Sequence, residues 1–184
     1  MEVPLAWYDA QLAALPLFTK TWTAIVLYVL GDVANQRWSW LEKAPRSRGD
    51  YAFDYSRTTR MAVWASIATA PNALWYLFLD ANEGALYGVG VSVIVQKIAL
   101  DQFVWSPPIS MAFFVFDALA QGASWLEAAA LSSPKVFPVL RISWLVWPCF
   151  HAVTYTLIPL RYRMLWINAC MVAWSAILSR RAAA

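Results

Sequence analysis

The stretch from residue 61 to residue 79 contains no charged side chain. A helix needs about 20 mostly apolar residues to cross the hydrocarbon core of a bilayer, and this stretch meets that requirement. Residues 142–160 form a second such stretch if His151 is neutral, and residues 21–38, interrupted by Asp32, form a third that is nearly as long. The sequence therefore predicts an integral membrane protein.

Composition supports this prediction. Hydrophobic residues make up 61% of the chain and charged residues 14%, whereas a soluble domain has about 25% charged residues. A soluble protein of this length could not bury so much apolar surface. The apolar runs do not alternate with polar residues as the strands of a membrane barrel would. We therefore expect an all-α fold, a polytopic bundle of transmembrane helices.

The remaining apolar segments are shorter or carry charges. Residues 86–105 contain Lys97 and Asp101 and are expected to end at Ser106-Pro107-Pro108, while residues 124–131 are expected to form an interfacial connector. The predicted organisation is a single integral membrane domain, residues 1–184, with four main spans and one or two short membrane-embedded helices. The spans are placed at residues 17–38, 61–80, 86–105 continuing as 109–122, and 136–160, with a C-terminal helix at 164–179.

Several polar side chains lie within the predicted spans. An ionisable group at bilayer depth costs about 2.5–3.5 kcal/mol and needs a partner or a wet cavity. One interpretation is that these groups line a path for solutes or ions. The other is structural: Lys97 and Asp101 pair four residues apart on one helical face, and Asp32 pairs with Arg57 or Arg60. The polar candidates are Asp32, Gln36, Gln96, Lys97, Asp101 and Gln102.

His151 is the only histidine of the chain. It is a candidate ligand for a metal or a pigment magnesium, although a packed, hydrogen-bonded role is commoner for a lone histidine, because metal sites recruit several converging ligands. No metal site is predicted. The known catalytic motifs are missing, so we do not expect an enzyme. Nor does any arginine stripe indicate binding to nucleic acid.

The spacing of polar and aromatic residues resembles the Mpv/PMP family of small peroxisomal and mitochondrial inner-membrane proteins, which includes the twenty-two-kilodalton peroxisomal membrane protein. The resemblance covers nearly the whole chain. Two departures are that Ala70 stands where the family usually has Gly, and that His151 follows Trp-Pro where the family favours Gln. The matching residues are Leu15-Pro16, Thr19-Lys20, Gly31-Asp32, Gln36, Asp54-x2-Arg57-Thr58-x-Arg60, Trp75-Tyr76-x2-Leu79-Asp80, Lys97-x3-Asp101-Gln102, Pro107, Trp144-x2-Trp147-Pro148, Pro159-x3-Arg163, Trp174 and Leu178-Ser179.

The resemblance implies a four-span helical protein of an organelle membrane, described in the family as channel-like. Its residues of interest correspond here to Asp32, Gln36, Arg57, Arg60, Lys97, Asp101, Gln102 and Arg163. The expected function is a channel or pore-modulating protein for small solutes or ions, in the mitochondrial inner membrane or the peroxisomal membrane.

The alternative is a non-catalytic subunit of a large respiratory or photosynthetic membrane complex. That alternative extends to the thylakoid membrane and to a chlorophyll-type pigment held through His151. No other cofactor is expected. The expected partners are membrane lipids, some of them bound, and either further copies of the chain or the subunits of a larger complex.

Overall fold

The computed structural model describes residues 3–42, 52–83 and 90–182. In this part of the chain every regular element is a helix, which confirms the all-α prediction. The helices form two compact units, which are described separately. Unit 1 comprises Met1–Asn72 with Met164–Ala184, and unit 2 comprises Ala73–Arg163.

Among the residues that the structure describes, four helical segments are long and apolar enough to cross a membrane. They are α2 (Pro16–Glu42), α3 (Tyr55–Ala81), the composite helix Val91–Ala120 and α7 (Trp125–Leu157). The predicted spans 17–38 and 61–80 lie within α2 and α3, whereas the third and fourth were predicted to end two and three residues beyond the composite helix and α7. The predicted start of the third, at residues 86–89, lies outside the described residues. The chain is therefore a polytopic helical membrane protein.

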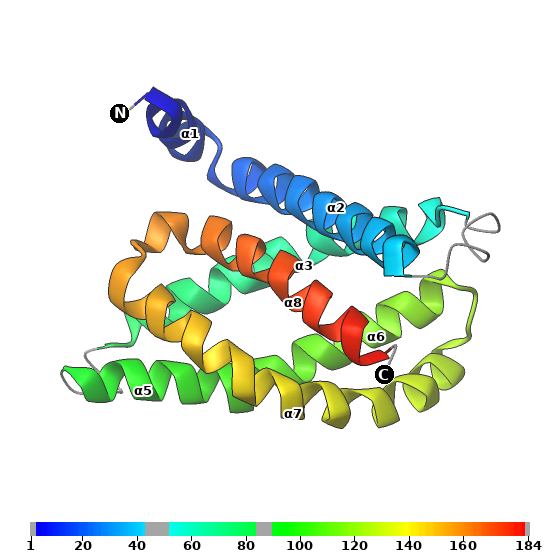
Figure 1. The fold of residues 1–184 in the computed structure, drawn as a ribbon. Helices are drawn as coiled ribbons and strands as arrows, with labels where there is room; N and C mark the ends of the chain where they lie inside the picture. The colour runs from blue at the N-terminus through cyan, green and yellow to red at the C-terminus, as the bar shows by residue number, and fades with distance from the viewer. Residues whose placement is uncertain (1–2, 43–51, 84–89, 183–184) are drawn as a thin grey trace. The chain divides into compact units, whose positions relative to one another are not determined.

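Unit 1 contains α1 (Val3–Ala14), α2, the first part of α3 and nearly all of α8 (Arg163–Ala182). Pro16 starts α2, in the first helical turn where its missing N–H costs no hydrogen bond. The Thr19 hydroxyl lies 3.0 Å from the Gln11 carbonyl oxygen and 2.8 Å from that of Leu15, and so ties α1 to α2. The bend between these two helices is visible in Figure 1.

Gly31 brings α2 close to α8 within unit 1. A Cβ atom on this glycine would lie 3.4 Å from a methyl group of Val172. Farther along the same two helices, the Asn35 amide nitrogen donates to the Ser175 hydroxyl at 2.7 Å. A small residue followed by a polar contact is a common way for membrane helices to associate.

Unit 2 contains the last part of α3, α5 (Val91–Leu100), a π-helical segment (Asp101–Trp105), α6 (Ser106–Ala120), α7 and the short 3-10 turn Leu160–Tyr162. In Figure 1, α6 and α7 run side by side after a tight reversal. Gly122 has φ +94° in this reversal, a conformation that favours glycine.

Two predictions about helix boundaries are wrong. The prolines after Ser106 do not end the third span, because they occupy the first turn of α6, where proline is tolerated. The π-helical segment Asp101–Trp105 joins α5 to α6. Residues 124–131 are not a separate connector either: Ser124 and Glu127 form a reciprocal capping box that starts α7 at Trp125.

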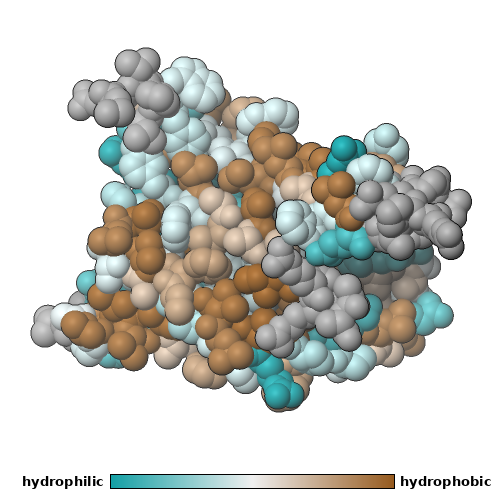
Figure 2. Space-filling view, viewed as in Figure 1, coloured by the Kyte–Doolittle hydropathy of each residue, from teal (hydrophilic) through white to brown (hydrophobic). Residues whose placement is uncertain are grey.

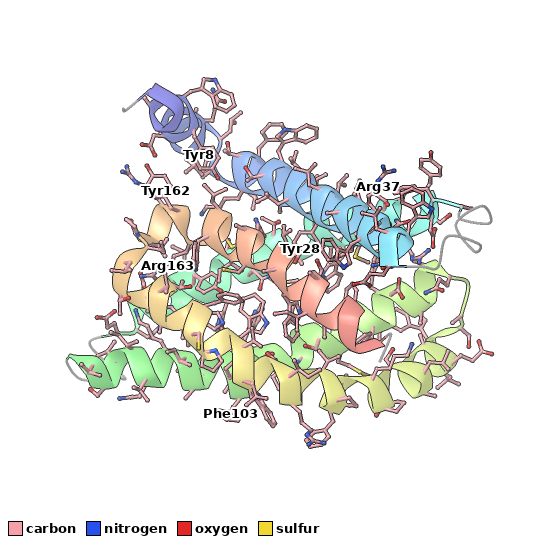
Figure 3. All side chains as sticks on the ribbon, in the orientation of Figure 1. Tyr8, Tyr28, Arg37, Phe103, Tyr162 and Arg163 are labelled. Carbon is pink, nitrogen blue, oxygen red and sulfur yellow. The ribbon has the colours of Figure 1, made fainter. Side chains whose placement is uncertain are left out.

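The outer surface of the helices is apolar. Large hydrophobic side chains such as Phe103 (64% exposed), Leu145 (74%) and Leu157 (72%) point away from the protein. Figure 2 shows apolar residues, coloured brown, over much of the face in view, and Figure 3 shows Phe103 projecting outward. Hydrocarbon, rather than water, is the solvent that such a surface matches.

Candidate functional site: buried polar clusters in both units

The polar residues predicted from the sequence gather in three clusters. Each is named for its most buried charged residue. The Asp32 cluster lies in unit 1, and the Lys97 and Asp101 clusters lie in unit 2. Of the predicted residues, Gln96 is half-buried on α5, and Arg60 is half-buried on α3.

The Asp32 cluster joins α2 to the beginning of α3. Asp32 is only 4% exposed, and the Arg57 Nε atom lies 2.7 Å from its Oδ1. Its Oδ2 accepts hydrogen bonds from Gln36 Nε2 at 2.8 Å and from the Thr58 hydroxyl at 2.6 Å. The predicted pairing of Asp32 with an arginine is thus confirmed for Arg57.

Gln36 also fixes the start of α3. Its Oε1 accepts from the Asp54 backbone N–H at 2.9 Å, and its Nε2 lies 3.1 Å from the Asp54 carbonyl oxygen. The Asp54 carboxylate accepts from the backbone N–H of Arg57 at 2.8 Å, as an N-terminal cap does. The Gln36 side chain is therefore engaged in fixing the start of α3, which favours a structural role over lining a path for solutes.

The Lys97 cluster gathers charges from three elements. The Lys97 ammonium lies 2.6 Å from Asp80 Oδ1 and 2.6 Å from Glu83 Oε2. Arg163 Nη1 lies 2.6 Å from the same Asp80 oxygen. Two cations and two carboxylates thus compensate each other. The Tyr155 ring lies beside both cations, 5.6 Å from Lys97 Nζ and 5.3 Å from Arg163 Cζ.

The Asp101 cluster lies one helical turn along the third span. Asp101 is 4% exposed, and its Oδ1 accepts from Trp75 Nε1 at 3.0 Å. Its Oδ2 lies 2.7 Å from His151 Nε2 and 3.1 Å from Gln102 Nε2. Gln102 Oε1 in turn accepts from the Ser143 hydroxyl at 3.1 Å. The cluster links α3, the π-helical segment and α7.

The predicted ion pair between Lys97 and Asp101 is wrong. Their spacing places both on one helical face, but Lys97 extends toward the C-terminal end of α3, and Asp101 accepts from α3 and α7 side chains instead. Sequence reasoning missed Asp80 and Glu83 because they follow an apolar run and look like loop residues. They could have been found from the requirement that a lysine buried in a membrane span, here Lys97, be neutralised by a nearby acid.

His151 is packed and hydrogen-bonded, as the commoner of the two interpretations predicted. It is 2% exposed and lies between the rings of Trp147 and Tyr155, with ring centroids 5.3 and 5.8 Å away. Its Nδ1 atom has no hydrogen-bond partner among the described residues. The described part of the chain contains no group of three or more potential metal ligands.

The sequence profile of the Mpv17/PMP22 family matches residues 118–179, which include all of α7 and most of α8. Protein SYM1 of Gibberella zeae is 31% identical over 176 residues, covering 95% of each chain. The chain belongs to the Mpv17/PMP22 family.

Other relatives extend over similar lengths. Protein SYM1 of Saccharomyces cerevisiae is 28% identical, covering 94% of this chain and 86% of its own length. PXMP2/4 family protein 2 of Dictyostelium discoideum is 27% identical, covering 89% of this chain and 83% of its own length. No solved structure matches the chain. These matches cover nearly the whole chain and confirm the predicted membership of the Mpv17/PMP22 family.

Proposed function

We propose that this protein is a non-catalytic channel or pore-modulating protein for small solutes or ions in an organelle membrane. The observation that carries the proposal is the burial of Lys97, Asp101 and Arg163 within unit 2 of a membrane protein. Charged side chains at bilayer depth are costly, and where they occur they commonly mark the route of an ion or solute.

In this proposal the two clusters of unit 2 act as a gate. The Lys97 cluster holds its charges in pairs between α3, α5 and the start of α8, so the paired arrangement is closed to ions. Opening would separate the pairs and present charged groups to the solute, as rings of charge do in selective pores. The Asp32 cluster would keep α2 and α3 in register.

The membrane of residence is proposed from the family resemblance. The family described in the sequence analysis contains peroxisomal and mitochondrial inner-membrane proteins, and these two membranes are favoured here. Expression of the full chain with a fluorescent tag, imaged against markers of both organelles, tests this part. Location at the plasma membrane alone would contradict it.

Reconstitution of the purified protein in planar bilayers tests the channel itself. Under a KCl gradient, Lys97→Met should move the reversal potential toward cation preference, and Asp101→Asn should move it toward anion preference. The matched controls are Lys135→Met, which removes an exposed lysine of α7, and Asp117→Asn, which removes a half-buried acid of α6. Both controls should keep the original selectivity.

Two outcomes would contradict the proposal at different levels. Absence of conductance from the wild-type protein, with folding verified by circular dichroism, would exclude a channel. Conductance with the same selectivity in Lys97→Met, Asp101→Asn and both controls would show that these residues do not line the path. The opposite signs expected for the two charge removals distinguish a pore effect from general loss of folding.

A second candidate function is that of a subunit in a larger membrane complex. One observation favours it: Phe103, Phe137 and Trp144 form an aromatic cluster on the outer surface of unit 2. The centroid of the Trp144 ring lies 5.4 Å from that of Phe103 and 6.3 Å from that of Phe137. Such rings suit a protein partner or bound lipid. Native electrophoresis after gentle detergent extraction should then show comigration with a large complex, and a colourless complex would exclude a pigment at His151.

A further inference from the structure

Two buried cations of unit 2 converge on a single carboxylate oxygen. Lys97 Nζ and Arg163 Nη1 each lie 2.6 Å from Asp80 Oδ1. Their side chains are 4% and 10% exposed, so both positive charges have lost most of their water. Arg163, labelled in Figure 3, lies where the chain turns from α7 into α8.

The two cations are also held by groups other than acids. Arg163 Nε donates to the Ile158 carbonyl oxygen at 3.3 Å, and its guanidinium lies 5.3 Å from the centre of the Tyr155 ring. Lys97 contacts the same ring from 5.6 Å. Aromatic faces attract cations, most strongly where water is excluded. The cations are therefore preorganised even if one of the acids leaves.

The acids that neutralise them are more exposed than the cations. The Asp80 side chain is 24% exposed, and the Glu83 side chain is 49% exposed. Among the described residues Glu83 pairs with Lys97, and it lies beyond the end of α3. Because the Glu83 carboxylate is half in water, its release costs little desolvation, and another anion can neutralise the buried Lys97 in its place.

Arg163 retains unused donors. A guanidinium has five N–H groups in a planar fork. Nε and Nη1 are engaged by Ile158 and Asp80, whereas Nη2 has no hydrogen-bond partner in the described part of the chain. An anion with two oxygens can use this nitrogen together with the Lys97 ammonium.

We propose that Lys97 and Arg163 bind the carboxylate of a small organic acid, which takes the place that the Glu83 carboxylate holds in this structure. Without Glu83, the two cations and Asp80 carry one net positive charge, which matches one carboxylate. Glu83 then acts as an internal competitor for the site. This inference rests on the proposed function, since it names organic anions as the solute class.

Binding to the full-length protein in detergent tests the site without any bilayer. Ligands that bind the native state raise its unfolding temperature, which tryptophan fluorescence follows. Sodium succinate should raise this temperature relative to sodium chloride at equal ionic strength. In Glu83→Gln the midpoint succinate concentration should fall by about two- to fivefold, the range for loss of a half-exposed ion pair. The matched control, Asp117→Asn, should behave as wild type.

Three results would overturn the inference. These are an identical succinate response in wild type and Glu83→Gln, no response in either, and an equal response to inorganic phosphate, which would exclude selection for carboxylates. Lys97→Gln should abolish the succinate response. If Lys97→Gln fails to fold, the comparison of Glu83→Gln with wild type decides the matter. Succinate binding without conductance would contradict only the channel, whereas conductance without succinate binding would contradict only this site.

Discussion

Replacement of Asp101 by leucine should destabilise the protein strongly. Leucine has the branched outline of aspartate, with two bulkier methyl groups in place of the oxygens, and offers no acceptor. Three donors that now meet the carboxylate would lose their partner: Trp75 Nε1, His151 Nε2 and Gln102 Nε2. Because Asp101 is only 4% exposed, water cannot easily replace it.

The magnitude follows from the number of contacts. Hydrogen bonds between side chains in membrane proteins average about 0.6 kcal/mol and reach about 1.7 kcal/mol. Three such bonds give a loss of about 2–5 kcal/mol for Asp101→Leu, with relief of the buried charge favouring the lower end. Asp101→Asn keeps one acceptor, and the other histidine tautomer can accept from its amide, so about 1–2 kcal/mol is expected.

Unfolding with increasing mole fraction of dodecyl sulfate in mixed micelles, followed by tryptophan fluorescence, measures the free energy of unfolding. Asp117→Leu is the matched control: Asp117 accepts from Gln121, which lies just past the end of α6, and this replacement should change the free energy by less than about 1 kcal/mol. A change below about 0.5 kcal/mol for Asp101→Leu, or equal changes at both positions, would refute the assigned hydrogen bonds.

Three further variants test other contacts by the same unfolding assay. Arg57→Met should lower the free energy of unfolding by about 1–2 kcal/mol, because the buried Asp32 loses its cation while two neutral donors remain. An unchanged free energy would show that this ion pair does not contribute to stability. Gly31→Ile should cost about 1–3 kcal/mol by forcing α2 away from α8, whereas Gly31→Ala should stay within about 1 kcal/mol of wild type. Ser124→Ala should cost about 1 kcal/mol by removing the cap of α7, and a neutral result would show that this helix start does not depend on it.

The spans were predictable because the bilayer imposes a length and a polarity that a sequence shows directly. Residues 61–79, with no charge, lie within α3, the span around Asp32 lies within α2, and nearly all of the span around His151 lies within α7. The end of α7 was placed three residues too late, at residue 160: Ile158 precedes a proline and is extended, so the helix ends at Leu157. The helix through Pro107 was not predictable, because a π-helical segment depends on tertiary packing rather than on local propensity.

The candidate site was only partly predictable. Burial of Lys97 and Asp101 follows from their place in an apolar run, and the pairing of Asp32 with an arginine, Arg57 or Arg60, follows from the need to neutralise a buried acid. The choice of partner does not follow in the same way. Two residues four positions apart can pair with each other or with neighbouring helices, and only the packing of α3 and α7 against the third span selects the second outcome.

The central claim is that the exposed apolar faces of these helices contact lipid. A spin label attached to a Phe103→Cys variant, in a background without Cys149 and Cys170, tests it in reconstituted vesicles by electron paramagnetic resonance power saturation. The claim predicts greater collision with oxygen, which dissolves in the hydrocarbon, than with a water-soluble nickel complex, because Phe103 is 64% exposed and projects outward. Greater collision with the nickel complex would place this face in water and contradict the account.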